Sequence, residues 1–430
     1  MKKRTGILSF VMMLALIFSL LIGCNKASTD VETSDTTEVQ VAEGFPTLKI
    51  NGVALNNYKV VYDNNANSGE QAFSYFNQKI GELYGVTLQG STEIGEGYEI
   101  LLGLDNSDET IAAEYEKNPD GVIGASGNKI ILLGINYGAL SQVIDSFLEK
   151  ADGTDTNKEI LVTECEAADV KKDFLKVMSY NVLYDMKKEG REANCRSEMV
   201  STILGEAPDV FGTQENNAEH HKFFTENLPE YSSCLGADET LSNYIYWKTD
   251  KFNLIKKGYF YMSDTPAVRS KYEGSNSYRS FTYVILEVKE TGKQFLFIDV
   301  HTDYHAEESV RVKQLAALTS LLPKINKNNL PMIILGDFNT TPTKVNGAVP
   351  YFLKDNPTIG MTSEVAQSKG DTGGTLAVSG FTKRDNRYIF DYIFVTTDKI
   401  YTQYYSVVNN IKNGKYPSDH LPVTAEIIIY

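Results

Sequence analysis

The chain has 430 residues, a formal net charge of −15 at pH 7 and 42% hydrophobic residues, a length that allows two or three domains with sizeable cores. The charge is uneven, because from residue 173 onward 28 Lys and Arg stand against 31 Asp and Glu, which gives −3 there and −12 for the rest. A nearly neutral second part lacks the basic stripe that is typical of high-affinity nucleic-acid binders.

Residues 1–24 are expected to be a lipoprotein signal peptide. A positively charged start precedes mostly apolar residues 7–22, a run too short for a comfortable membrane span. Residues 21–24, Leu-Ile-Gly-Cys, resemble a bacterial lipoprotein cleavage box, which would place a lipid on Cys24. We therefore expect a protein anchored to the cell membrane on its extracytoplasmic face, with an uncleaved anchor as the alternative. Residues 25–44, polar and without an aromatic residue, predict a flexible linker.

Residues 45–165 predict a small α/β accessory domain. Apolar runs at 58–62, 98–103 and 129–133 are typical of strands, and two segments with helical spacing of apolar residues lie between and after them. This alternation predicts a layered sheet. The pattern resembles the non-catalytic N-terminal domain of some hexosaminidases and alpha-glucuronidases, so a spacer role and a glycan-binding role are both open. Turn and charge signals over 151–172 indicate the domain boundary.

From residue 173 onward, several apolar runs end in polar residues. In the run 331–342, four apolar residues and Gly336 precede Asp337 and Asn339, which project from the same side of an extended chain. One such segment alone could be an ordinary turn. Other runs of the same kind deliver Asn181, Glu215, His301, Asp391 and the sequence Ser418-Asp419-His420. Packing alone does not explain six apolar runs that each end in polar residues. Strand ends are also where α/β proteins carry out chemistry.

These residues, in this order, resemble the endonuclease/exonuclease/phosphatase superfamily of deoxyribonuclease-like, metal-dependent phosphoesterases. The resemblance covers residues 173–430 and includes the Gly-Asp-x-Asn and Ser-Asp-His signatures. It implies an α/β fold of four layers, in which a two-sheet β-sandwich is flanked by helices. The active site would lie in a cleft at one end of the sandwich.

The resemblance implies a metal site and a phosphate-binding residue. Glu215 would hold a divalent cation, with Asn181 and Asp419 completing or orienting the site. Oxygen ligands of this kind suit Mg²⁺, and Mn²⁺ is possible. Arg279 would grip two phosphate oxygens with its planar guanidinium group.

The remaining site residues receive catalytic roles from the same resemblance. Asp337 and Asn339 would hold and polarise the attacking water. His420 would lie against the scissile phosphate, and Asp391 would orient it as a carboxylate orients imidazole in other hydrolases. His301 would be a second imidazole that contacts the phosphate or donates a proton.

Other features leave the substrate class open. The strand before Asp391 departs from the family's Arg-Ile-Asp pattern. In some deoxyribonuclease-type members a carboxylate pairs with the first histidine of the site, and no residue of this sequence can be assigned to that carboxylate. The basic cluster of Lys383, Arg384 and Arg387 could meet a phosphate or lie in a solvated loop. Residues that could line the pocket but carry no signature are Asp303, His305, His220, His221, Tyr231, Tyr244, Tyr246, Trp247 and Tyr272. A surface position is favoured for His220 and His221, and simple packing for most of the aromatic residues.

We therefore expect an extracellular, lipid-anchored, metal-dependent phosphoesterase that hydrolyses a phosphodiester or phosphomonoester with activated water. The alternatives are a surface nuclease that acts on DNA or RNA, and a catalytically inactive surface protein that binds a glycan or a partner. Cys165, Cys195 and Cys234 are expected to be buried small hydrophobic residues, although one disulfide is permitted. The oligomeric state stays open.

Overall fold

The computed structural model describes residues 44–63, 67–104, 108–184, 194–237 and 243–430. The predicted signal peptide, its lipid-accepting Cys24 and nearly all of the predicted linker lie outside these residues. Within the described ranges, no helix has both the length and the apolar character that a membrane crossing requires.

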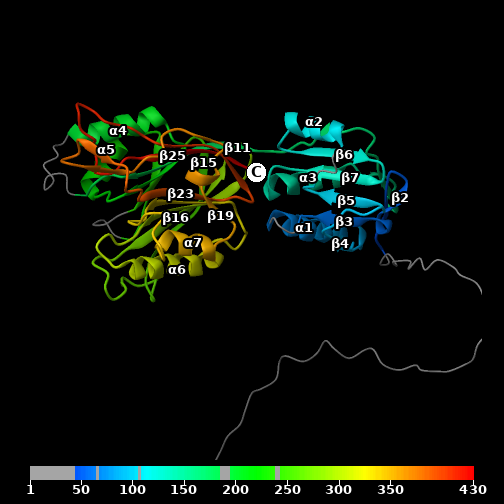
Figure 1. Cartoon of the computed structure of the whole chain (residues 1–430), viewed down its shortest axis with the longest axis horizontal. Helices are drawn as coiled ribbons and strands as arrows, with labels where there is room; N and C mark the ends of the chain where they lie inside the picture. The colour runs from blue at the N-terminus through cyan, green and yellow to red at the C-terminus, as the bar shows by residue number, and fades with distance from the viewer. Residues whose placement is uncertain (1–43, 64–66, 105–107, 185–193, 238–242) are drawn as a thin grey trace, which may run out of the picture. The chain divides into compact units, whose positions relative to one another are not determined.

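Residues 44–170 form an α/β arrangement (Figure 1). Its elements are β1 (Thr47–Ile50), β2 (Val53–Ala54), a 3-10 helix (Leu55–Asn57), β3 (Lys59–Tyr62), α1 (Asn67–Tyr84), β4 (Gly90–Ser91), β5 (Glu99–Leu102), α2 (Glu109–Lys117), β6 (Val122–Ser126), β7 (Lys129–Leu133), α3 (Tyr137–Glu149), β8 (Asp152–Gly153), β9 (Asn157–Ile160) and β10 (Glu166–Ala167). The described strands make a six-stranded sheet ordered β10-β6-β7-β5-β3-β4 and a four-stranded sheet ordered β2-β1-β9-β8.

The three strands expected from the sequence of this part are β3, β5 and β7, which lie side by side as parallel strands. Phe76 of α1 and Ile144 of α3 pack in one core cluster with Val60 and Ile100 of the sheet. Ile111 of α2 packs with residues of the opposite sheet face. The sheet is therefore covered by helices on both faces, which explains why its strands are continuously apolar. The proposed domain boundary stays a prediction.

Residues 173–430 contain the remaining elements. They are β11 (Asp173–Asn181), α4 (Asn194–Glu206), β12 (Val210–Gln214), α5 (Ala218–Asn227), β13 (Tyr231–Leu235), β14 (Tyr244–Lys248), β15 (Phe252–Tyr261), β16 (Ser280–Val288), β17 (Gln294–His301), α6 (Glu308–Ile325), β18 (Met332–Asp337), α7 (Ala348–Asp355), β19 (Ile359–Met361), α8 (Thr362–Val365), β20 (Ser368–Lys369), β21 (Leu376–Val378), β22 (Lys383–Asp385), β23 (Asp391–Thr396), β24 (Ile400–Val407) and β25 (Val423–Ile429).

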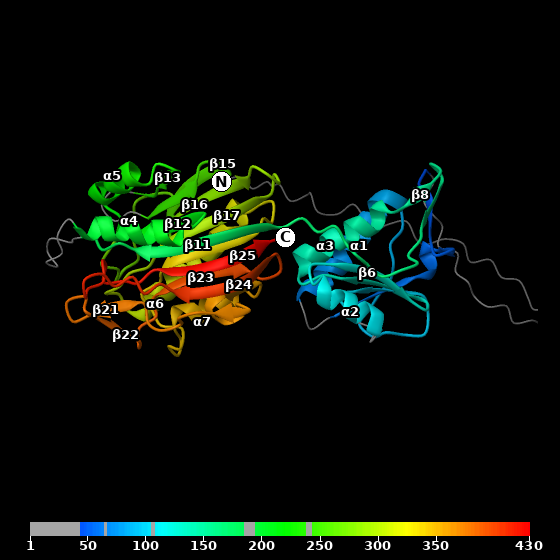
Figure 2. The same cartoon turned by 90° about the horizontal axis from the view of Figure 1, so that it is seen from above.

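Two mixed sheets pack face to face in this part (Figure 2). Their strand orders are β13-β14-β12-β11-β25-β24-β20 and β15-β16-β17-β18-β23-β19, and a separate hairpin pairs β21 with β22. Successive side chains of a strand point to opposite faces. Val177 of β11 therefore packs in the core between the sheets, whereas Met178 packs with α4 and α5.

The second sheet follows the same alternation. Leu335 of β18 belongs to the core between the sheets, and Ile334 packs with residues of α6 and α7 on the outer face. The layers are therefore helices, sheet, sheet and helices. This result confirms the predicted four-layer α/β sandwich.

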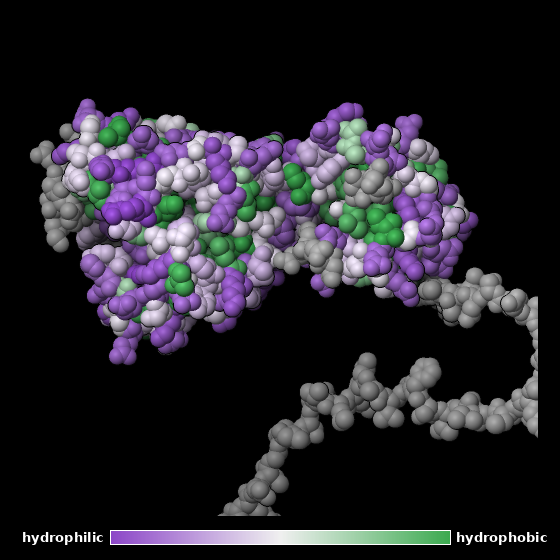
Figure 3. Space-filling view, in the orientation of Figure 1, coloured by the Kyte–Doolittle hydropathy of each residue, from purple (hydrophilic) through white to green (hydrophobic). Residues whose placement is uncertain are grey.

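The cysteine prediction is only partly correct. Cys195 and Cys234 are buried, but Cys165 is half-buried, and no two of these three are joined by a disulfide. Figure 3 shows hydrophilic residues over most of this face of residues 173–430, with apolar residues in small patches between them.

Candidate active site

Strand pairing explains why polar residues far apart in the sequence meet. Asn181 ends β11, and Glu215 directly follows β12, its parallel neighbour. In the other sheet, His301 and Asp337 are register partners at the ends of the parallel strands β17 and β18. Asp337 is also the register partner of Asp391, the first residue of antiparallel β23. Carboxyl ends of parallel strands share one edge of a sheet, so these five residues are delivered to the same end of the sandwich.

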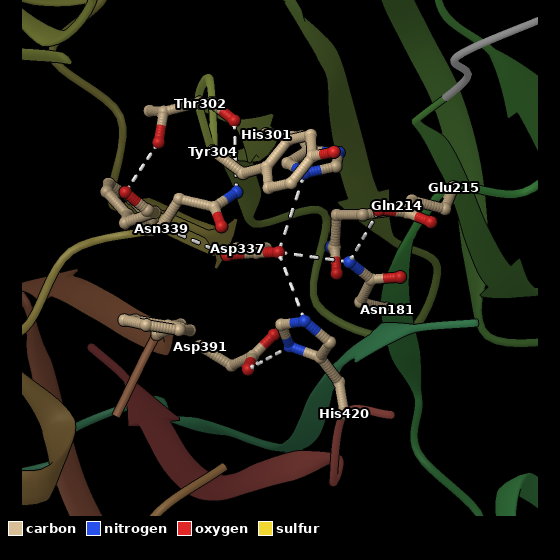
Figure 4. A network of polar contacts seen from close by, with 12 residues as sticks. Asn181, Gln214, Glu215, His301, Thr302, Tyr304, Asp337, Asn339, Asp391 and His420 are labelled. Atoms are coloured by element: carbon tan, nitrogen blue, oxygen red, sulfur yellow. Dashed lines mark hydrogen bonds and ion pairs between the residues drawn. The ribbon is translucent and has the colours of Figure 1, made fainter. Parts of the chain in front are cut away.

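Asp337 is the centre of this cluster (Figure 4). It is 1% exposed, and its Oδ2 accepts a hydrogen bond from Asn181 Nδ2 at 3.0 Å. The same oxygen lies 3.4 Å from His301 Nε2 and 3.6 Å from His420 Nε2. Its Oδ1 accepts from the backbone N–H of Asn339 at 2.9 Å. One buried carboxylate therefore contacts four of the residues predicted from the sequence.

Asp391 and His420 form a buried pair beside Asp337. His420 Nδ1 donates to Asp391 Oδ2 at 2.8 Å, and neither side chain is more than 7% exposed. Burial by itself lowers the pKa of His420, but the charges of Asp391 and Asp337 outweigh it and raise that pKa well above its usual value. The charges around His420 therefore favour its imidazolium form, and Asp391 fixes the orientation of the ring.

His301 differs from His420 because its partner is a cation. Arg279 Nη1 donates to His301 Nδ1 at 2.9 Å, so the ring proton sits on Nε2, which faces Asp337. Burial, followed by the charge of Arg279, lowers the pKa of His301 well below its usual value. A neutral ring with its hydrogen on Nε2 can donate one hydrogen bond, which is compatible with the phosphate-contacting role expected of His301. Arg279 occupies the place at which a carboxylate partner was sought.

Arg279 is itself unusual for a buried cation. It is 5% exposed, and its Nε has no hydrogen-bond partner. Across the described ranges, no carboxylate forms an ion pair with it within 4 Å. Burial lowers its pKa, and the surrounding Glu215, Asp303 and Asp337 act in the opposite direction. A desolvated guanidinium group without an acidic partner is a good binding group for an anion.

The backbone at the strand ends is constrained. Gly336 has φ 142°, and a Cβ at this position would lie 1.8 Å from the carbonyl oxygen of Val300, so only glycine fits next to β17. Glu215 and Asn339 have φ angles of 58° and 47°, values that non-glycine residues seldom adopt. Such conformations concentrate at functional sites, where the surrounding structure maintains them.

Glu215 and Asp419 provide oxygen atoms that fit a divalent cation. Glu215 Oε2 accepts from the backbone N–H of Tyr184 at 2.9 Å, and Oε1 lies 3.4 Å from Asn181 Nδ2. Burial raises the pKa of Asp419; the charge of His420 lowers it, and nearby Glu215 raises it further. Two acids that repel each other in a partly buried site are a donor set that Mg²⁺ would stabilise.

Asn181 is oriented as a bridge in this arrangement. Its Oδ1 accepts from the backbone N–H of Leu183 at 3.1 Å, and its amide nitrogen faces Glu215 and Asp337. Asp337, Asp391 and His420 also have potential ligand atoms within 4.8 Å of one another. That second grouping fits a cation less well, because a protonated imidazole offers no lone pair.

Several residues without a signature serve the fold instead. The surface position favoured for His220 is wrong: the side chain is 0% exposed, and Nε2 lies 3.0 Å from the carbonyl oxygen of Leu183. His221 is half-buried and stacks on Tyr244 at 4.2 Å between ring centroids. The aromatic residues that are buried, as simple packing predicts, are Tyr231, Tyr244, Tyr246 and Trp247, whereas Tyr272 is half-buried.

Two of the three basic residues of the cluster have acidic partners. Arg384 pairs with Asp371, and Arg387 Nη2 lies 2.7 Å from Asp385 Oδ2. Lys383 and Arg384 lie on β22, and the Arg384 side chain is only 13% exposed, so the solvated-loop interpretation fits Arg387, which is 78% exposed, but not Arg384. Asp303, named as a possible substrate contact, is fully buried and hydrogen-bonded to backbone N–H groups.

Comparisons with known proteins agree with this architecture. Residues 178–420 match the model of the Endonuclease/Exonuclease/phosphatase family. An endonuclease/exonuclease/phosphatase family protein from Bacteroides thetaiotaomicron is similar in structure, with 24% identity, a TM-score of 0.55, and coverage of 60% of this chain and 99% of that chain. A mannosyl-6-phosphatase from Bacteroides thetaiotaomicron VPI-5482 is 25% identical, with a TM-score of 0.54 and coverage of 59% of this chain and 99% of that chain. No curated protein matches the chain.

Proposed function

Because the chain belongs to the endonuclease/exonuclease/phosphatase family, whose members hydrolyse phosphate esters, we propose that it is a divalent-metal-dependent phosphatase whose substrate is a sugar phosphomonoester. The observation that carries this proposal is the shared contact of Asn181, His301, Asn339 and His420 with the single buried carboxylate of Asp337. The choice of substrate is supported by the similarity to a mannosyl-6-phosphatase. The nearly neutral charge from residue 173 onward argues against nucleic acid.

In the proposed reaction the water oxygen forms a bond to phosphorus, the bond between phosphorus and the sugar oxygen breaks, and the leaving oxygen takes up a proton from solvent to become the sugar hydroxyl group. Burial raises the pKa of Asp337, although His420 opposes this shift, so its carboxylate is a stronger base than an exposed aspartate. Asp337 would hold the attacking water and accept its proton. Asn339, whose N–H group fixes Asp337 Oδ1, keeps that carboxylate in place.

The cationic and neutral imidazoles would act on the phosphoryl group. His420, held by Asp391, places a fixed positive charge beside Asp337, where negative charge develops on the phosphoryl oxygens. Neutral His301 can donate its Nε2 hydrogen to one of these oxygens. Mg²⁺ held by Glu215 and Asp419, with Mn²⁺ as an alternative, would neutralise further negative charge on the phosphate.

A panel of substrates tests the proposal. The full chain is treated with EDTA, divided, and assayed with and without added Mg²⁺ on mannose 6-phosphate, bis(p-nitrophenyl) phosphate and supercoiled plasmid. We expect inorganic phosphate to be released from mannose 6-phosphate only in the Mg²⁺ samples. Nicked plasmid without phosphate release would instead identify the nuclease alternative. Metal binding without turnover of any of the three would favour an inactive binding protein.

We also propose that the mature protein begins at a lipid-bearing Cys24 and lies on the extracytoplasmic face of the membrane. The support is the Leu-Ile-Gly-Cys sequence that ends a short apolar segment.

A further inference from the structure

Tyr304 is an exposed aromatic residue at the candidate active site. It follows β17 by three residues and is 57% exposed, whereas the aromatic residues Tyr244, Tyr246 and Trp247 are buried. Figure 4 draws Tyr304 in the same close-up network as His301 and Asn339. Tyr304 is therefore on the segment that leaves the site at His301, whose Nδ1 accepts a hydrogen bond from the buried Arg279 that we assign to phosphate binding.

The loop that carries Tyr304 is held in place by buried polar groups. Asp303 is fully buried, and its carboxylate accepts from the backbone N–H groups of Ser277 at 2.9 Å and His305 at 3.2 Å. The backbone N–H of Asp303 donates to Gln314 Oε1 at 3.0 Å. The residues on both sides of Tyr304 are therefore held by hydrogen bonds, and one of these bonds joins the loop to Ser277, in the segment that precedes β16.

Arg311 of α6 also holds this loop in place through hydrogen bonds. The side chain is 6% exposed, and its Nη1 donates to the carbonyl oxygens of Asp303 at 2.9 Å and Ala306 at 2.8 Å. The rings of Tyr304 and His305 lie 3.5 Å apart between centroids, which limits the positions that the tyrosine can take. A loop that is already ordered loses little conformational entropy when a ligand binds. Buried groups of this kind preorganise an exposed aromatic surface beside the phosphate site.

We propose that Tyr304 forms the leaving-group subsite and binds the ring of a hexose 6-phosphate by stacking. This proposal rests on the proposed function and names the part of the substrate that the site recognises. The face of a sugar ring presents C–H groups that pack on an aromatic ring, and the phenol hydroxyl can hydrogen-bond to a sugar hydroxyl. An acyclic phosphomonoester offers no such face, so Tyr304 should discriminate between substrates that carry the same phosphate group.

The test compares Tyr304→Ala with Tyr259→Ala. Tyr259 is a matched control because it is also an exposed tyrosine, at 44%, and lies on the edge strand β15. Dissociation constants for mannose 6-phosphate and glycerol 3-phosphate are measured by calorimetry, and phosphate release is measured on both. For Tyr304→Ala we expect a roughly three- to tenfold weaker binding of mannose 6-phosphate and unchanged binding of glycerol 3-phosphate. Tyr259→Ala should bind both as the wild type does.

Three results would overturn the subsite. They are an equal loss of affinity for both ligands, no loss for either, and the failure of the wild-type protein to bind mannose 6-phosphate. If the wild-type protein binds mannose 6-phosphate in a Tyr304-dependent way but releases no phosphate, the subsite stands and the proposed phosphatase function fails. Tyr304→Trp keeps an aromatic face and should retain most of the affinity, which separates stacking from damage to the loop.

Discussion

Replacing Asp391 by Asn should slow phosphoester hydrolysis by about 10²- to 10⁴-fold. Asp391 is 0% exposed, and among the described residues its carboxylate is the only hydrogen-bond acceptor of the His420 ring. An amide oxygen can still accept that bond, so the ring should keep its position. The negative charge that favours the imidazolium form is lost, and with it the fixed positive charge beside Asp337.

The magnitude follows from the burial of the pair. Removing one preorganised electrostatic group from an active site slows the reaction about 10²- to 10³-fold, and replacing the aspartate that orients a catalytic imidazole by Asn slows it up to about 10⁴-fold. The side chains of both residues are almost fully buried, with exposed fractions of 7% for His420 and 0% for Asp391, so solvent screens this interaction very little. The assay is kcat/KM on mannose 6-phosphate at saturating Mg²⁺.

A matched control is Asp385→Asn. Asp385 also pairs with a cation, but its partner Arg387 is 78% exposed, so this pair should contribute little and kcat/KM should stay within about twofold. A kcat/KM for Asp391→Asn within threefold of the wild-type value, in a protein with an unchanged melting temperature, would refute the assigned role of this pair.

Three further predictions concern stability and targeting. Burial raises the pKa of Glu308, but hydrogen bonds, first among them the one from Thr340, lower this pKa to about 2. The ionised Glu308 therefore stabilises the fold fully above pH 4.5, its usual pKa, and this stabilisation is lost as the pH falls toward 2. Glu308→Gln should accordingly lower the unfolding free energy by about 1–3 kcal/mol in urea melts at pH 7 and by less at pH 3; equal losses at both pH values would contradict this. Gly336→Ala forces a Cβ against Val300, so we expect a lower melting temperature, and an unchanged value would show that the strand ends relax freely. Cys24→Ala should abolish labelling with a radioactive fatty acid in bacterial cells, and undiminished labelling would exclude lipidation at this residue.

Much of the fold could be predicted from local patterns. Short apolar runs such as 129–133 and 331–335 indicate strands wherever they occur, and their alternation with amphipathic segments indicates layers. The polar residues at strand ends could be found in the same way, because Asp337 and Asn339 break an apolar run at a glycine. The structure brings them together with residues from distant strands, as the pattern of polar strand ends predicts.

The parts that could not be predicted depend on contacts between distant segments. Asp299 lies inside an apolar strand and is fully buried, where its Oδ1 accepts from Gln214 Nε2 at 2.6 Å. Burial raises the pKa of Asp299 well above its usual value. No local periodicity marks such a pair, because it forms across the two sheets of the sandwich.

The partners of the histidines were missed for the same reason. His301 accepts a hydrogen bond from Arg279, which directly precedes the neighbouring strand β16, and no carboxylate is marked in the sequence for that place. His220 follows a polar stretch that is typical of a surface helix, yet Arg196 Nε donates to its Nδ1 at 3.0 Å in the interior. The position of a histidine in its helix is visible in the sequence, but the partner that buries it is not.

The central claim is that the residues around Asp337 form one site that hydrolyses phosphomonoesters. The most direct test is the rate of phosphate release from mannose 6-phosphate by the wild-type protein and by Asp337→Asn, both with Mg²⁺ and with the same melting temperature. We predict measurable turnover for the wild type and a loss of at least about 10³-fold for Asp337→Asn, because the variant can no longer accept the proton of the attacking water. Turnover within tenfold of the wild-type rate would contradict the claim.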